Sequence, residues 1–239
     1  MGIQQLNSIY EALIEGLERY GDNMSLPKLK EILEEDNSKY SKTALSQIRQ
    51  LIDRNPFTHE DPIEWKDVAE SDGEVFIIQL TQYPREVQLL ISEFILWDLW
   101  NYSIRFGNKN KPMPVLLDEA QNLDHTDGSP SARILTEGRK FGWSGWYATL
   151  FLKSQLEADE LARLQNASEK IYFSPPETEF SNIVTGLSNE QSEKKRWESI
   201  LSKLKKGQCI VQAPLLKENK ELSEQTAVVV DISPLSDRI

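Results

Sequence analysis

The sequence predicts an α/β fold in which a mostly parallel sheet, flanked by helices, follows a small all-helical subdomain. From about residue 62 onward, short apolar runs alternate with segments whose apolar residues recur every three or four positions. Alternation of this kind is typical of a parallel sheet covered by helices. Before residue 62 only the helical spacing occurs. We therefore expect a helical subdomain over 1–61 and a sheet-containing domain over 62–239.

Three helices are expected within residues 3–57. The first, IQQLNSIYEALIEGLERYG, ends at Gly21, the second begins after the favourable N-cap residue Ser25, and the third stops before Pro56. We expect all three to have charged outer faces. The apolar positions that predict the first helix are Leu6, Ile9, Tyr10, Leu13, Ile14 and Leu17.

The second domain is predicted as a succession of strands and helices. The helix at 84–106 is apolar nearly all round, so we expect it to be buried on two sides. No helix separates the last two strands, which are therefore candidates for an antiparallel edge. The expected strands are 74–80, 113–121, 143–151, 171–175, 208–215 and 225–233. The expected helices are 84–106, 131–142, 157–170, 178–187 and 194–207.

Composition limits the classes of function. The formal net charge of the 239 residues is −11, so contact with nucleic acid needs a local basic patch or a larger assembly. A single cysteine, Cys209, excludes an intrachain disulfide and is expected in the core. No run of about 20 apolar residues and no signal-type segment occurs, which predicts a cytoplasmic protein with no membrane contact.

Two adjacent carboxylates follow the apolar run PVLL, in the sequence PVLLDEAQNL. In nucleotide-hydrolysing folds of the P-loop class, an Asp at the end of a buried strand holds Mg²⁺, and a following Glu orients or deprotonates the attacking water. Asp118 and Glu119 have this layout. The alternative is that the strand simply ends in an acidic turn.

Two further motifs follow the two acids along the chain. TEGRKFG, residues 136–142, lies about twenty residues beyond the acids, and LQNASEKIYF, residues 164–173, leads into the next expected strand. Together the three motifs resemble the second half of the ATPase core in the HerA/FtsK family of hexameric DNA pumps, from the Walker B strand onward. The expected helical subdomain over 1–61 resembles the insertion that this family carries before its Walker B strand. The resemblance covers nearly the whole chain and implies part of a RecA-like P-loop ATPase core.

The resemblance implies roles for matching positions. Asp118 would hold Mg²⁺, Glu119 would be the catalytic glutamate, and Arg139 would reach a neighbouring subunit's nucleotide, with Lys140 as a weaker candidate for that task. Thr149 would contact bound ATP. The alternative for Arg139 is a solvated cation near a helix C-terminus.

The implied partners are double-stranded DNA, further copies of the chain in a hexameric ring, and a nuclease or restriction partner in repair or phage defence. The DptH-like ATPases of DNA phosphorothioation-dependent restriction are a narrower resemblance.

The sequence departs from the family pattern in two ways. Leu150 follows Thr149 where relatives have Gln, and none of the eleven glycines begins the phosphate loop G-x-x-x-x-G-K-[ST]. Backbone donors and a lysine for the β- and γ-phosphates are therefore missing. We expect this chain to be the C-terminal part of a longer ATPase, completed by the N-terminal part of its own core, and inactive alone.

A non-catalytic assembly module or a DNA-binding module is the alternative function. The stretch 194–206 carries six cations, and Lys203, Lys205 and Lys206 are the candidate DNA contacts. The simpler interpretation of these lysines is the solvated face of an amphipathic helix. The DHTDG stretch at 124–128 is expected to be a turn, although its carboxylates and imidazole could also face a metal.

Overall fold

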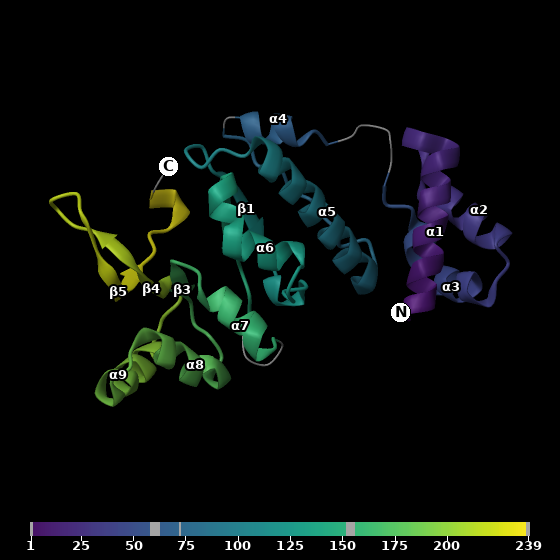
Figure 1. Cartoon of the computed structure of the whole chain (residues 1–239). Coiled ribbons are helices and arrows are strands. Elements are labelled where there is room, and N and C mark those ends of the chain that lie inside the picture. Colours follow the sequence, from purple (N-terminus) through teal and green to yellow (C-terminus); the bar gives the residue numbers. More distant parts are fainter. Residues whose placement is uncertain (1, 58–62, 72, 152–155, 238–239) are drawn as a thin grey trace. The chain divides into compact units, whose positions relative to one another are not determined.

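We describe the fold from a computed structural model, which covers residues 2–57, 63–71, 73–151 and 156–237 (Figure 1). The fold is mixed α/β. By its internal contacts the chain divides into two compact units, residues 1–95 and residues 96–239.

The first unit begins with three helices, as the sequence predicts. They are α1 (Ile3–Tyr20), α2 (Leu26–Glu35) and α3 (Lys39–Arg54), drawn in purple in Figure 1. Their shared core consists of Ala12, Leu29, Ile32 and Leu33, with Tyr20, Met24, Leu26, Leu45 and Ile48 packed against it. The Ser38 hydroxyl caps α3 by accepting a hydrogen bond from the Ser41 amide at 3.0 Å. A left-handed Asn55 then ends α3 before Pro56.

The face of α1 that packs against α2 and α3 is not its large apolar face. The buried residues of α1 are Ala12 and Gly16, whereas the leucines and isoleucines that predict the helix are exposed, except for the half-buried Ile9. Charged residues share the exposed surface of α1 with these apolar side chains, so its outer face is only partly charged. Small residues form the inward face because they let the helices approach closely: a Cβ on Gly16 would lie 2.4 Å from the Met24 Cε.

The segment between α4 (Trp65–Glu70) and α5 (Arg85–Phe106) differs from expectation. Residues 74–80 form neither strand nor helix, and the side chains of 75–78 are between 43% and 83% exposed. A strand is stable only when its backbone groups pair, and no partner strand for 74–80 occurs in the described part of the chain. The predicted strand is thus absent here.

The helix α5 confirms the long apolar helix predicted at 84–106. In the first unit, Val87 and Ile91 of α5 pack against Leu51 of α3. In the second unit, Leu99 and Trp100 are buried. Other apolar residues of α5 remain exposed, so burial on two sides is only partial: Leu90, Phe94, Ile104 and Phe106. No helix in the described residues is both long enough and apolar enough to cross a membrane.

The first half of the second unit contains a two-stranded parallel sheet. Strands β1 (Met113–Leu117) and β2 (Trp143–Tyr147) pair from Met113↔Trp143 to Leu117↔Tyr147. They are connected through α6 (Pro130–Glu137) and the 3₁₀ turn η3 (Gly138–Phe141). Ser129 caps α6 by accepting a hydrogen bond from the Ala132 amide at 3.1 Å.

The second half contains an antiparallel sheet in the order β3-β4-β5. The long hairpin of β4 (Gln208–Leu216) and β5 (Leu222–Asp231) confirms the antiparallel edge that the sequence allowed (Figure 1). The short β3 (Lys170–Tyr172) also runs antiparallel to β4, so the prediction of one largely parallel sheet is wrong. Among the described strands only β1 and β2 are parallel.

Three helices accompany these strands: α7 (Ala158–Gln165), α8 (Glu177–Leu187) and α9 (Gln191–Leu201). Helices α8 and α9 cover β4 through a core of Phe180, Ile183, Val184, Trp197, Leu201 and Ile210. Cys209 is buried at the start of β4, as expected. Its burial raises the pKa of the thiol.

Candidate functional site

The carboxyl ends of β1 and β2 bring three of the predicted site residues to one edge of the parallel sheet. Asp118 and Glu119 follow β1 directly, and Thr149 lies two residues beyond β2. The pairing continues past both strands, because the Ala148 amide donates to the Leu117 carbonyl at 2.9 Å and the Ala120 amide donates to the Ala148 carbonyl at 2.8 Å. In open α/β sheets this edge is the place where ligands bind.

The two acids lie on a sharp turn. Glu119 has a φ of 51°, in the left-handed region that non-glycine residues rarely adopt, and it begins the 3₁₀ turn η2 (Ala120–Asn122). The Asp118 Oδ1 accepts a hydrogen bond from the Glu119 amide at 3.0 Å. The Gln121 side-chain amide donates to the Glu119 carboxylate. Both acids are exposed, so they are open to a ligand in solution.

A buried polar pair supports this turn. The His125 Nε2 lies 2.7 Å from the Ala120 carbonyl oxygen, and its Nδ1 lies 2.7 Å from the Ser131 hydroxyl. Because a carbonyl can only accept, the Nε2 donates to Ala120, and in that tautomer the Nδ1 accepts from the Ser131 hydroxyl. The Arg163 guanidinium adds a hydrogen bond of 2.7 Å to the His125 carbonyl. The turn after β1 is thereby tied to α6 and α7.

Further polar side chains are buried in the same part of the second unit. The Tyr147 ring lies 6.4 Å from the His125 ring, and burial raises the pKa of Tyr147 far above its ordinary value. Within the described residues, the Gln121 Oε1 and the Trp143 Nε1 are buried without a hydrogen-bond partner. Unpaired buried polar atoms cost free energy, so this region holds the turn at the expense of some stability.

The acids suit a magnesium ion that is held mainly by phosphate and water. Among the described residues, no group of three or more His, Cys, Asp or Glu side chains could hold a metal alone. Mg²⁺ in nucleotide sites needs only one or two carboxylates beside the phosphate oxygens. Asp118 is exposed, and hydrogen bonding to the Glu119 amide uses one of its two carboxylate oxygens. Its carboxylate therefore fits the role of a single protein ligand.

Arg139 and Lys140 lie at the other end of the parallel sheet. Both belong to η3, which precedes β2, and the Gly142 carbonyl accepts a hydrogen bond from the Met113 amide at the amino ends of the strands. Five residues of strand separate this end from the acids, about 16 Å. Lys140 pairs with Glu137 at 3.4 Å, and Arg139 is exposed. The structure therefore does not bring these cations to Asp118 and Glu119.

Thr149 is held by a local hydrogen bond. Its hydroxyl donates to the Phe151 carbonyl at 2.8 Å, and the side chain is only partly buried. Leu150, which stands where the resembled family has Gln, is exposed and offers no polar group. Thr149 is thus the polar side chain nearest in sequence to the end of β2.

The lysines predicted as DNA contacts lie outside α9. The helix ends at Leu201, so Lys203, Lys205 and Lys206 occupy the turn that leads into β4, and the prediction of a helix to 207 is wrong. The turn is closed by the left-handed Gly207, with a φ of 86°, and by a hydrogen bond of 3.0 Å from the Lys205 amide to the Gln208 side chain. All three lysines are exposed, and within the described residues none forms an ion pair. They make one small basic surface.

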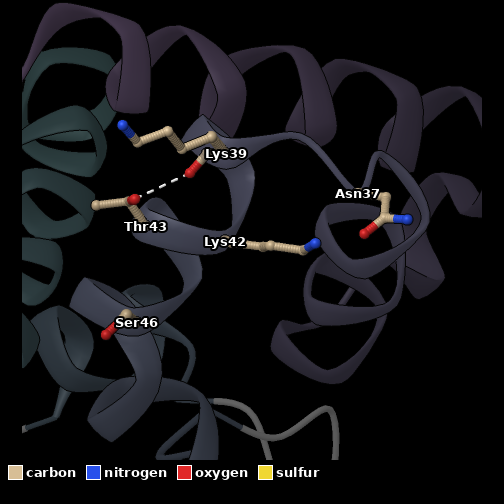
Figure 2. A pocket seen from close by; sticks show the side chains of 5 residues that line it. All are labelled: Asn37, Lys39, Lys42, Thr43 and Ser46. Carbon is tan, nitrogen blue, oxygen red and sulfur yellow. Dashed lines mark hydrogen bonds between the residues drawn. The ribbon is translucent and has the colours of Figure 1, made fainter.

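A hollow of about 570 Å³ lies at the start of α3, far in sequence from the acids (Figure 2). Figure 2 shows Lys42 extending toward Asn37, while the Thr43 hydroxyl donates a hydrogen bond of 2.9 Å to the Lys39 carbonyl within the helix. The hollow is open to solvent and is lined by Asn37, Lys39, Lys42, Thr43 and Ser46. Lysines beside one helix N-terminus are a common surface feature and do not by themselves define a site.

Sequence reasoning did not find the His125–Ser131 pair. The DHTDG stretch is a turn, as expected: the Asp124 carboxylate accepts from the Thr126 amide at 2.8 Å. However, His125 within it is fully buried rather than displayed on the surface. The one signal available was the proximity of a histidine to the acidic motif, six residues beyond Glu119.

No protein-family model matches the chain, and no curated protein matches it either.

Proposed function

We propose that this chain is the C-terminal part of a RecA-like ATPase core from a HerA-like DNA translocase. The observation that carries the proposal is the placement of Asp118 and Glu119, with Thr149, at the carboxyl ends of a parallel strand pair. Ligands of open α/β sheets bind at this edge. Adjacent acids there match the needs of nucleoside triphosphate hydrolysis.

In this proposal the two acids have different tasks. Asp118 would hold Mg²⁺, which would offset the negative charge of the phosphates. Glu119 accepts a proton from the attacking water or orients it, and the amide of Gln121 holds its carboxylate in place. Thr149 contributes a hydroxyl at the same edge. The His125–Ser131 pair keeps the turn in position from the inside.

Arg139 acts on a different nucleotide in this proposal. Its position at the amino ends of the strands, about 16 Å from the acids of its own chain, suits an arginine that reaches the site of a neighbouring copy. Such an arginine stabilises the charge that develops on the transferred phosphate. This arrangement requires several copies around a ring, which we propose to be a hexamer, and Lys140 assists from the same turn.

Two exposed apolar surfaces, one in each unit, support a partner polypeptide. The segment 75–78 is exposed although it is as apolar as a buried strand, and Leu116 of β1 and Trp146 of β2 are exposed on the parallel sheet. Apolar surface of this kind is normally covered in a working protein. We propose that the N-terminal part of the same ATPase core, with the phosphate loop, supplies the covering strands. This chain alone then has little or no ATPase activity.

The proposed substrate of the motor is double-stranded DNA. A DNA pump of this type would act beside a nuclease or restriction partner, in DNA restriction, phage defence or repair, and DNA phosphorothioation-dependent restriction is the narrower proposal. We propose a cytoplasmic location.

The test is a reconstitution of ATPase activity. This chain is mixed with a polypeptide that carries the N-terminal core and its phosphate loop, and ATP hydrolysis is measured with Mg²⁺. The proposal requires each part alone to be inactive and the mixture to hydrolyse ATP. A mixture that binds tightly and does not hydrolyse ATP would instead favour a non-catalytic assembly module.

The basic turn of Lys203, Lys205 and Lys206 favours a second candidate, a DNA-binding module without ATP chemistry. The three lysines are exposed and unpaired within the described residues, despite the strongly acidic chain around them. Binding of DNA by this chain alone, with the affinity falling as salt rises, would support it.

A further inference from the structure

The helix α1 is attached to its own unit by its small residues. Ala12 and Gly16 are buried against α2 and α3, and a side chain on Gly16 would collide with Met24 and Ile32. A helix that served only this core would be expected to turn its large apolar side chains inward. In α1 the large side chains lie on another face.

This outward face is a continuous apolar stripe. The residues are Ile3, Leu6, Tyr10, Leu13, Ile14 and Leu17, which we call the α1 stripe, and they are between 38% and 79% exposed. Five of them, all except Ile14, recur at alternating three- and four-residue steps. That spacing is the seam through which two helices pair side by side in a coiled coil.

The α1 stripe is nearly unchanged when the helix direction is reversed. If two copies lie antiparallel with the two-fold axis beside Tyr10, then Ile3 of one faces Leu17 of the other, and Leu6 faces Ile14. Leu13 is the exception, because it falls opposite Asn7. An interface that uses the same patch on both partners requires self-complementarity of this kind. The pattern therefore fits a second copy of the same helix.

The exposed area of the stripe lies at the lower end of the range for a specific contact. The exposed fractions of the six residues add up to about three complete side chains. With the roughly 150–250 Å² that an aromatic side chain buries as an upper guide, this is at most on the order of 600 Å² per partner. Stable interfaces bury about 800 Å² per partner. Residues that flank the stripe would supply the difference.

Charge also favours the antiparallel direction. The first turn of α1 contains no acidic residue, and its N-cap residue Gly2 makes no side-chain capping hydrogen bond. In the antiparallel pair Glu18, which is exposed, comes next to this first turn of the partner. A carboxylate near a helix N-terminus is favourable because the amide groups there are unpaired and carry partial positive charge.

We propose that the α1 stripe is a self-docking surface, through which two copies of the chain form a dimer of antiparallel α1 helices. The contact has closed two-fold symmetry, unlike the head-to-tail contacts of a ring. It needs neither nucleotide nor DNA, so it stands independently of the proposed ATPase function.

The first experiment measures mass against concentration for the whole chain by sedimentation equilibrium. We expect a monomer–dimer equilibrium, and Leu13→Glu should raise the dissociation constant at least roughly 100-fold, because a two-fold contact contains each substitution twice. Leu216→Glu is the control, since Leu216 is an exposed leucine on β4 outside the α1 stripe, and it should leave the equilibrium unchanged. Far-ultraviolet circular dichroism confirms that each variant keeps its helices.

A cross-linking experiment tests the direction of the helices. Tyr10→Cys lies on the proposed axis and should form a disulfide-linked dimer under mild oxidation. Ile3→Cys alone should not, whereas the double variant Ile3→Cys, Leu17→Cys should. The unaltered chain is the control, because its Cys209 is buried.

Three results would overturn the proposal. The first is a chain that remains monomeric up to several hundred micromolar. The second is a dimer that survives both Leu13→Glu and Leu6→Glu in variants that keep their helical content. The third is cross-linking through Ile3→Cys alone as readily as through Tyr10→Cys, which would indicate a parallel pair.

Discussion

The Nδ1 of His125 lies 2.7 Å from the hydroxyl oxygen of Ser131, and both side chains are fully buried. The other ring nitrogen contacts the carbonyl of Ala120, the residue after Glu119. The histidine thus joins the turn that carries the two acids to the first turn of α6. A chain of hydrogen bonds inside the protein thereby positions a group at its surface.

Removal of the Ser131 hydroxyl should destabilise the second unit. In Ser131→Ala the buried Nδ1 loses its donor, which costs about 1–3 kcal/mol. Urea unfolding followed by tryptophan fluorescence measures the change in the free energy of unfolding. Ser192→Ala, an exposed serine in α9, is the control and should change it by less than about 0.5 kcal/mol. Equal stability of both variants would show that the histidine does not need this partner.

Glu119→Gln should abolish ATP hydrolysis in the reconstituted core. The amide keeps the size and the hydrogen-bonding capacity of the side chain but cannot accept a proton, and loss of a general base lowers turnover by roughly 100- to 10,000-fold. ATP binding should persist, because Asp118 is unchanged. Glu224→Gln, an exposed glutamate on β5, is the control. Full activity of Glu119→Gln would remove the glutamate from the proposed mechanism.

Replacement of the three turn lysines tests the basic surface. With Lys203, Lys205 and Lys206 changed to Gln, DNA binding should weaken, and the slope of log K against log salt should fall by about 0.9 for each phosphate that the protein no longer neutralises. Fluorescence anisotropy with a labelled duplex measures both quantities. The control changes Lys66, Lys109 and Lys111, which are equally exposed lysines. Equal weakening in both variants would indicate only a general effect of charge.

Gly107→Ala should destabilise the second unit, whereas Gly186→Ala should not. A Cβ at Gly107 would lie 1.8 Å from the Phe141 carbonyl oxygen, so the loop after α5 must move away from η3, at a cost of about 1–3 kcal/mol. A Cβ at Gly186 in α8 meets only the Tyr172 hydroxyl at 3.9 Å. Alanine there should add about 0.5–1 kcal/mol through helix propensity. Thermal unfolding of the two variants should therefore shift in opposite directions.

Asp36 should contribute to stability in a pH-dependent way. Hydrogen bonds from the hydroxyls of Ser41 and Ser38 lower the pKa of Asp36 below its ordinary value. A carboxylate whose pKa is lower in the folded protein than in the unfolded chain stabilises the folded protein at a pH above its pKa in the unfolded chain. This stabilisation is lost as the pH falls through its pKa in the folded protein. Asp36→Asn should therefore lower the melting temperature at pH 7 and have no such effect near pH 2. A loss of equal size at both pH values would contradict the electrostatic origin, and Asp53→Asn is the surface control.

The sequence predicted those elements whose signal is local. The apolar spacing of α1, α3 and α5 and the turn residues Gly21 and Asn55–Pro56 lie within a few positions of the helices that they define. The strand at 74–80 was not formed, because a strand depends on a partner that the segment itself cannot specify. The direction of β3 against β4 depends likewise on how the chain returns through α8 and α9.

The same difference between local and long-range signals applies to the candidate site. The placement of Asp118 and Glu119 at a strand end was predictable, because an apolar run and the acids after it are adjacent in sequence. The separation of Arg139 from these acids follows from the parallel pairing of β1 with β2, which no motif encodes. The buried state of His125 depends on α6 and α7 folding around it, so residue type alone could not reveal it.

The left-handed backbone of Glu119 opposes stability to the proposed chemistry at this position. Glycine would adopt the same conformation without the strain of roughly 1–2 kcal/mol that a Cβ brings. Glu119→Gly should therefore melt at a higher temperature than the natural chain even though it lacks the carboxylate. Glycine at this position would give a more stable protein. Selection for thermal stability alone would therefore replace Glu119 and remove the carboxylate that the proposed chemistry needs.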